Sequence, residues 1–145
     1  MIIRQYTTKD IDTIIRLEQA YLDSPWSRAV LIDTLKNPHT VMLVAEDGGG
    51  VIGYGSYSKA LDEAQINNIC VDIKARRKGA GGRILEALEI AAQKAGCTKL
   101  LLEAACDNAA AIGLYKKFGY TELYVRPKYY NGTKDAIVMS KVISD

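Results

Sequence analysis

A bend rich in glycine and positive charge, ARRKGAGGRILEAL at positions 75–88, separates a strand-like segment from a helix-like one. The run EAQINNICV before it (63–71) has β-like character, and the apolar positions after it recur at helical spacing up to Gly96. A further β-like run, TKLLLEAAC (98–106), follows. Because parallel strands need a crossover connection, this strand–helix–strand order predicts a parallel pair in the middle of the chain.

The remaining segments predict antiparallel strands and further helices on either side of this unit. The turn GGG at 48–50 joins two β-like runs, since glycine adopts positive φ at little cost. A threonine cap, a Pro-x-Ser start and an asparagine cap mark three helix beginnings. The expected strands are 2–6, 41–47, 51–59, 63–71, 98–106, 120–125 and 135–143, and the expected helices are 7–21, 25–37, 84–96 and 108–119.

This order of elements predicts an α/β (α+β) fold with a mixed, mostly antiparallel central sheet of about six to seven strands and helices on both faces. A single domain spanning 1–145 is expected, because a chain of 145 residues can bury a core without metals or disulfides.

Charge and cysteine content exclude several function classes. A formal net charge of +2, with charges of both signs interspersed, argues against a nucleic-acid partner. The first twelve residues lack the apolar run of a signal peptide or membrane anchor, so no membrane partner and a cytoplasmic location are expected. Cys70, Cys97 and Cys106 have no CxxC spacing, which predicts packed thiols and no bound metal.

The glycine-rich bend suits an anion. Glycines let backbone N–H groups approach a ligand closely, and the start of the following helix adds unpaired donors and the positive end of its dipole. A solvated turn is the structural alternative. A Walker loop is excluded by spacing, and a dinucleotide fingerprint fails because Ile84 stands where its third glycine would be.

The run NNICV (67–71), the bend RRKGAG (76–81), Glu103 on a strand and Asn108 at a helix start together resemble the GNAT family of acetyltransferases. The family's phosphate loop, Arg/Gln-x-x-Gly-x-Gly/Ala, is matched by Arg76, Gly79 and Gly81. Within the family, the chain is similar to the bacterial ribosomal-protein-alanine acetyltransferases of the RimI type. The segments that carry this likeness are SPWS, LDEAQINNICVD, LLLEAACDNAAAIGLYKKFGY and YYNGTKDAIVM.

The resemblance implies a binding site for acetyl-CoA. Main-chain groups of β-like residues would hold the acetyl and pantetheine portion, the bend would hold the pyrophosphate, and a helix-capping asparagine would add a contact. The implied cofactor-binding residues are Ile69, Cys70, Val71, Arg77, Lys78, Gly79, Ala80, Gly81, Gly82 and Asn108.

Glu103 and Tyr115 are the candidate catalytic residues. Strand alternation places Glu103 on the face opposite Leu100 and Leu102. Each of these residues and Asn108 also has a purely structural alternative. Glu103 could be an exposed strand glutamate, Asn108 only a helix cap, and Tyr115 only a packed core residue. By resemblance, Glu103 is the general base and Tyr115 the general acid. Acetyl transfer needs a neutral amine and a proton for the departing thiolate, which a carboxylate and a phenol can supply.

The resemblance also implies substrate-binding roles for Trp26, Tyr129 and Tyr130. Tyrosine pairs near an Asn-Gly turn are otherwise ordinary cross-strand packing. Two positions depart from the RimI-type pattern, since Ala105 stands where an arginine is common and Gly82 where a basic residue is frequent.

The sequence therefore predicts an acetyl-CoA-dependent enzyme that acetylates the N-terminal alanine of a small-subunit ribosomal protein by direct transfer in a ternary complex. A covalent route through Cys106 is not favoured, because the chain's one histidine, His39, lies in a distant loop and no base is expected beside the thiol. The alternatives are an acetyltransferase of small amines or internal lysines, and a non-catalytic acyl-CoA-binding module.

Overall fold

The computed structural model describes residues 1–21, 27–76, 78–130 and 134–143, without the side chains of Leu35, Tyr129 and Tyr130. Its strands are β1 (Ile2–Gln5), β2 (Thr40–Asp47), β3 (Gly50–Ala60), β4 (Glu63–Val71), β5 (Lys99–Ala105), β6 (Thr121–Tyr130) and β7 (Lys134–Val142). Its helices are α1 (Ile11–Tyr21), α2 (Arg28–Lys36), α3 (Ala80–Lys94) and α4 (Ala109–Lys117). Two short 3-10 turns, Thr8–Asp10 and Ile73–Ala75, precede helices α1 and α3.

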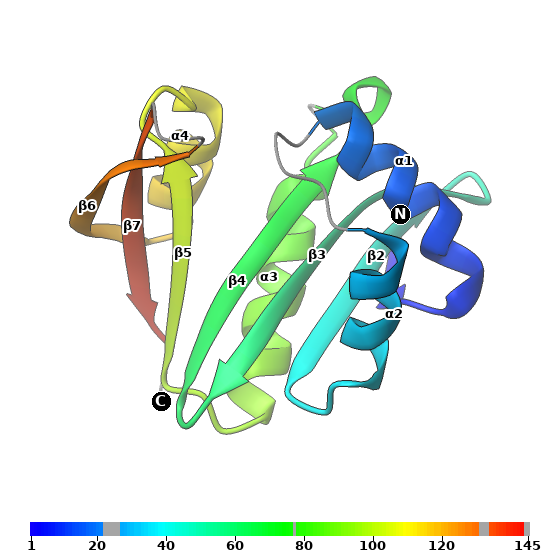
Figure 1. Ribbon diagram of the computed structural model, residues 1–145, viewed down its shortest axis with the longest axis horizontal. Helices are drawn as coiled ribbons and strands as arrows, with labels where there is room; N and C mark the ends of the chain where they lie inside the picture. The colour runs from blue at the N-terminus through cyan, green and yellow to red at the C-terminus, as the bar shows by residue number, and fades with distance from the viewer. Residues whose placement is uncertain (22–26, 77, 131–133, 144–145) are drawn as a thin grey trace.

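The strands form one seven-stranded sheet in the order β1-β2-β3-β4-β5-β7-β6 (Figure 1). Neighbouring strands are antiparallel except β4 and β5, which are parallel and are connected through α3. The predicted order of elements and the mixed, mostly antiparallel sheet are therefore confirmed.

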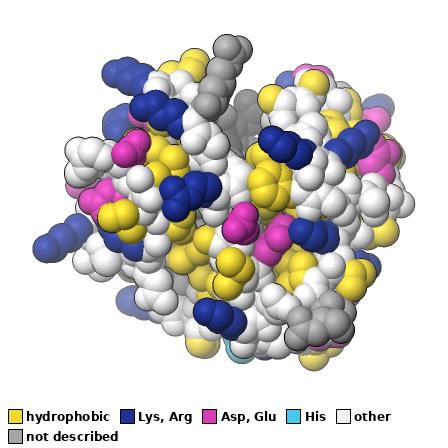
Figure 2. Space-filling view, turned by 180° about the vertical axis from the view of Figure 1, so that it is seen from behind, with side chains coloured by type: hydrophobic (Ala, Val, Ile, Leu, Met, Phe, Trp, Pro, Cys, Tyr) yellow, Lys and Arg dark blue, Asp and Glu magenta, His cyan; other side chains and the backbone are white. Residues whose placement is uncertain are grey.

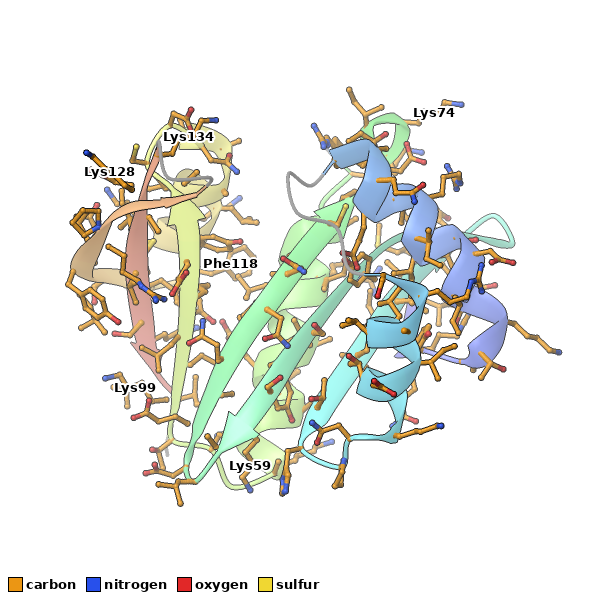
Figure 3. All side chains as sticks on the ribbon, in the orientation of Figure 1. Lys59, Lys74, Lys99, Phe118, Lys128 and Lys134 are labelled. Carbon is orange, nitrogen blue, oxygen red and sulfur yellow. The ribbon has the colours of Figure 1, made fainter. Side chains whose placement is uncertain are left out.

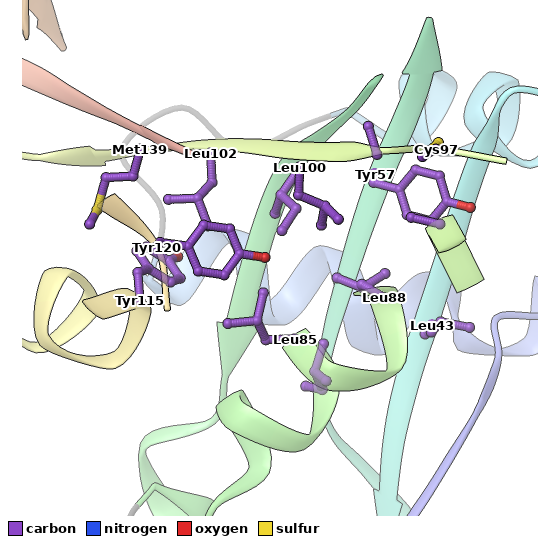
Figure 4. Packing of buried hydrophobic residues seen from close by; sticks show 14 of the residues in the cluster. Leu43, Tyr57, Leu85, Leu88, Cys97, Leu100, Leu102, Tyr115, Tyr120 and Met139 are labelled. Carbon is purple, nitrogen blue, oxygen red and sulfur yellow. The ribbon is translucent and has the colours of Figure 1, made fainter. Parts of the chain in front are cut away.

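The sheet separates two hydrophobic cores. On β2, the side chains of Met42 and Val44 enter the core under α1 and α2, whereas Leu43 and Ala45 enter the core under α3 and α4. This alternation follows from the two-residue period of a strand. Figure 4 shows the second core, where Leu85 of α3 lies near the tyrosines of the α4 region. The predicted helices on both faces are confirmed.

The last hairpin differs from the sequence prediction. Strand β6 extends to Tyr130, five residues beyond the predicted end at 125, although it contains Pro127. Proline is tolerated there because β6 is an edge strand, where one side of the ladder needs no donor. Register shifts interrupt its pairing with β7 between Glu122 and Tyr124 and between Arg126 and Tyr130.

Candidate active site

Strands β4 and β5 pair over only part of their length. Their pairs run from Glu63↔Lys99 to Gln65↔Leu101, although β4 continues to Val71 and β5 to Ala105, and both strands are described throughout. Figure 1 shows the two ribbons diverging beyond this point. Backbone groups on the facing edges must then find partners other than each other. The sheet therefore offers an unpaired strand edge in its interior.

A bulge in β4 accompanies this divergence. Ser56 pairs with Asn68 and Tyr57 pairs with Ile66, so Asn67 is an additional residue on β4. An extra residue bends its strand and increases the local twist. The Asn67 Nδ2 group donates to Ser58 Oγ at 3.0 Å and to Ser56 Oγ at 3.3 Å, which fixes the bulge against β3.

The segment after β4 is held by the end of α1. Asp72 accepts a hydrogen bond from Lys74 N at 3.1 Å and one from Tyr21 Oη at 3.2 Å. The Lys74 amide, the largest of several favourable contacts, holds the pKa of the Asp72 carboxyl below its usual value. The Tyr21 hydroxyl also accepts from Ile73 N at 3.1 Å, and the Arg76 guanidinium lies 4.9 Å from the Tyr21 ring centroid. Sequence reasoning missed Tyr21 and Asp72, because their contact joins segments 51 residues apart.

Helix α3 starts at the glycine bend, beside the end of β4. Gly79 adopts φ +78°, a left-handed conformation that a residue with a Cβ adopts at a cost. The first turn contains no acidic residue, and both Lys78 and Arg83 are exposed next to it. The first backbone N–H groups of an α-helix have no partner within the helix. The glycine bend, the helix start and the nearby positive charges on which the predicted anion site depends are therefore present together, and the site itself stays a prediction. Arg77 lies outside the described residues.

Gly82 has a packing role that the sequence did not reveal. A Cβ at this buried position would lie 2.7 Å from Cζ of Phe118, the residue that ends α4 (Figure 3). A side chain at this position would therefore require the half-buried Phe118 ring to move. A Cβ at Gly81 would instead make ordinary contacts, 3.4 Å from Leu114 Cδ2 and 4.0 Å from Val71 Cγ2. The start of α3, the end of β4 and α4 therefore converge at one place.

The three predicted residues of β4 point in two directions. Ile69 and Val71 are half-buried at the core under α3, while Cys70 is buried under α1. The Cys70 Sγ group donates to Leu17 O at 3.7 Å, and burial raises the pKa of this thiol to about 11. All three residues lie in the part of β4 that pairs with β3 but not with β5.

Glu103 lies on β5 with its side chain 15% exposed. Its neighbours Leu102 and Ala104 are buried in the core under α3 and α4, so Glu103 faces the other side of the sheet, as predicted. Its Oε1 atom accepts a hydrogen bond from Arg126 Nη1 of β6 at 2.5 Å. Glu103 is therefore half-buried and paired with an arginine, and it differs from the exposed strand glutamate that was the structural alternative.

Tyr115 lies on α4 and is 8% exposed. Its ring packs in the core with Leu102 and Met139, and its centroid is 6.1 Å from that of Tyr120 (Figure 4). Tyr115 and Glu103 therefore lie on opposite faces of β5.

Three hydrogen bonds involve the start of α4 and the segment after it. Asn108 Oδ1 accepts from Ala111 N at 3.1 Å, so the asparagine caps α4 as its sequence position predicts. The Tyr120 hydroxyl donates to Glu89 Oε1 at 2.9 Å, and Lys141 Nζ donates to Glu89 Oε2 at 3.0 Å. Burial, followed by the nearby Glu89 carboxylate, raises the pKa of Tyr120.

Other predicted residues fall elsewhere. Trp26 lies outside the described residues, and Tyr129 and Tyr130 belong to β6 by their backbone alone. Cys70 and Cys97 are buried as expected, but Cys106 is exposed, which corrects the prediction of a packed thiol. It stands in the turn just after the end of β5.

The described residues contain no group of three or more His, Cys, Asp or Glu side chains able to hold a metal ion. Within the same residues, every helix is too short or too polar to cross a membrane. On the face in Figure 2, acidic and basic side chains are interspersed, without a stripe of one sign.

The chain combines a divergent parallel pair of strands in a mixed seven-stranded sheet with a glycine-rich helix start beside that pair. The model of the acetyltransferase (GNAT) family matches residues 11–120. The chain belongs to the GNAT family.

The ribosomal protein bS18-alanine N-acetyltransferase of Escherichia coli (strain K12) is 32% identical over 98% of this chain and 97% of that protein. The crystal structure of the E. coli ribosomal-protein-S18-alanine N-acetyltransferase superposes with a TM-score of 0.90 over 99% of this chain and 94% of the other. An aminoglycoside 6'-N-acetyltransferase complexed with coenzyme A shares the fold, with 18% identity and a TM-score of 0.85 over 99% and 97% of the two chains.

Proposed function

We propose that this chain is an acetyl-CoA-dependent N-acetyltransferase that acetylates the N-terminal alanine of a small-subunit ribosomal protein. The observation that carries the proposal is the opening between β4 and β5, with the start of α3 near the end of β4. Glu103, on β5 beyond its last pair with β4, and Tyr115, in the core on the other face of the sheet, are the proposed catalytic residues. Full-length similarity to a bS18-alanine acetyltransferase supports the acceptor.

The residues around the opening fit coenzyme A chemically. The backbone amides of Ala80, Gly81 and Gly82 begin α3, where an anion such as a pyrophosphate is favoured. Lys78 and Arg83 can add positive charge from solvent. The edge of β4 that pairs with β3 but not with β5, at Ile69 to Val71, can bond to the amides of an extended pantetheine arm, although Val71 O already accepts from Arg76 Nε at 3.3 Å. Acetyl-CoA supplies the activated acetyl group as a thioester.

Glu103 and Tyr115 would handle the two protons of the transfer. As the amine nitrogen bonds to the acetyl carbon and the carbon–sulfur bond breaks, Glu103 accepts the proton lost by nitrogen and Tyr115 donates one to sulfur. An α-amino group has a pKa near 8, whereas that of a lysine is about 10.4, so a terminal amine is far more often neutral at pH 7. A carboxylate is a sufficient base for such an acceptor.

Transfer is proposed to be direct, in a ternary complex. The exposed Cys106 has no histidine near it among the described residues, since His39 lies in the loop between α2 and β2. The proposed contacts to the acceptor are Trp26, Tyr129 and Tyr130. We also propose that Asn108, which caps α4, contacts the cofactor. A cytoplasmic location stays a prediction.

The test combines acceptor profiling with two pairs of variants. Peptides that begin with Ala, Ser or Met, a polyamine and an aminoglycoside are incubated with acetyl-CoA, and products are identified by mass. Glu103→Gln and Tyr115→Phe should each lower kcat by about a hundredfold or more, because positioned acid–base groups contribute that much. Coenzyme A affinity should change little.

Matched controls come from β6, where Glu122 is exposed in an ion pair with Lys116 and Tyr124 is 56% exposed. Glu122→Gln and Tyr124→Phe should leave kcat unchanged. Acetylation of no free N-terminus would refute the acceptor assignment. Unchanged turnover in both site variants would refute the catalytic roles, and coenzyme A binding without turnover of any amine would support the acyl-CoA-binding alternative.

A further inference from the structure

Arg126 reaches Glu103 across the intervening strand β7. Arg126 pairs with Ala136 of β7, and Ala136 pairs with Ala105 of β5, so these three residues form one row across the sheet. Glu103 lies two residues before Ala105 and therefore shares its face. Because both intermediate side chains are single methyl groups, the long arginine side chain can cross this row to the carboxylate.

The arrangement places a permanent positive charge beside the proposed base. The Arg126 side chain is 44% exposed and that of Glu103 is 15% exposed, so the guanidinium is the more accessible partner of the pair. A guanidinium does not lose its proton in proteins. A protonated amine that approaches Glu103 would have to displace Arg126 or stay close to it, and like charges at short range repel.

We propose that Arg126 determines which amines reach Glu103, by disfavouring acceptors that carry their positive charge at neutral pH. The inference rests on the proposed function, in which Glu103 is the base. Terminal α-amines, which are partly neutral, are admitted, whereas lysine side chains and polyamines are discriminated against. Arg126 is thus a specificity-determining residue, supplied by the edge strand β6.

The turnover test compares two acceptors on one set of variants. An Ala-initiated peptide is measured against spermidine, and the ratio of their kcat/KM values is the readout. Arg126→Gln should reduce this ratio by about tenfold or more, since one unit charge a few ångströms away is removed. Arg126→Lys, which keeps a charge, should retain most of the ratio. Lys116→Gln removes a cation of an exposed ion pair, 3.6 Å from Glu122, and should leave the ratio unchanged.

A binding test separates this inference from the proposed function. Spermidine binding in the presence of coenzyme A is measured by equilibrium dialysis, and Arg126→Gln should bind it about tenfold or more tightly than the natural chain. If no amine is acetylated but this gain appears, the proposed function fails and the effect of Arg126 on amine access stands. Equal spermidine affinity in the two proteins, or an unchanged kcat/KM ratio, would overturn the inference.

Discussion

Gly53 of β3 pairs with Val71 of β4, the strand that forms one wall of the candidate site. A Cβ built at Gly53 would be 2.8 Å from the backbone oxygen of Cys70 and 3.3 Å from Val71 Cα. Both atoms belong to the β4 backbone, which no side-chain rotation can move. Because carbon contacts are optimal at about 3.5–4.0 Å, Gly53→Ala should displace β4 by roughly half an ångström or more.

The expected cost combines two opposing contributions. Overpacking in a filled core costs about 1–3 kcal/mol. Replacing glycine by alanine also restricts the unfolded chain, which stabilises by about 0.4–1 kcal/mol where the backbone tolerates it. Gly50, in the same strand, has nothing within 4 Å of its built Cβ and no positive φ, so Gly50→Ala receives only the second contribution. The two variants should differ by about 1–3 kcal/mol in free energy of unfolding.

Thermal unfolding and calorimetric titration with coenzyme A test this reasoning. Gly53→Ala should melt several degrees below Gly50→Ala, since about 1 kcal/mol corresponds to a shift of roughly 3 °C in a domain near this size. Its coenzyme A affinity should fall while that of Gly50→Ala stays unchanged, because β4 carries Ile69 to Val71. Equal melting temperatures and equal affinities in the two variants would refute the reasoning.

Two further predictions concern a buried carboxyl group and the three thiols. Hydrogen bonds from Arg4, at 2.9 Å, lower the pKa of the Asp10 carboxyl below its ordinary value of 3.8, so its stabilisation is present above about pH 4 and is lost as pH falls further. In urea unfolding, the difference in free energy of unfolding between the natural chain and Asp10→Asn should become smaller below that pH. A difference that stays constant with pH would contradict this prediction. For the thiols, a disulfide reagent at pH 8 should modify Cys106 rapidly, whereas buried Cys70 and Cys97, whose pKa values burial raises, should react only on unfolding. Rapid reaction of all three in the folded protein would count against the burial described.

The sequence by itself determined the elements and the family. The helical spacing after the bend, the turn at 48–50 and the cap at Asn108 are local properties, which a residue and its near neighbours decide. The alternation that turns Glu103 away from Leu102 is equally local, and the structure confirms it. The sequence predicted β6 too short, because local propensity counts Pro127 against a strand. The edge position of β6 allows this proline to stay in the sheet.

Only the tertiary structure decided how the site is assembled. Three features depend on which segments meet and in which register. They are the end of pairing between β4 and β5, the positions of Glu103 and Tyr115 on two faces of the sheet, and the contact of Gly82 with Phe118. The pairing of Arg126 with Glu103, 23 residues apart, is of the same kind. Such contacts arise when distant segments pack together, so no period or motif within a single segment contains them.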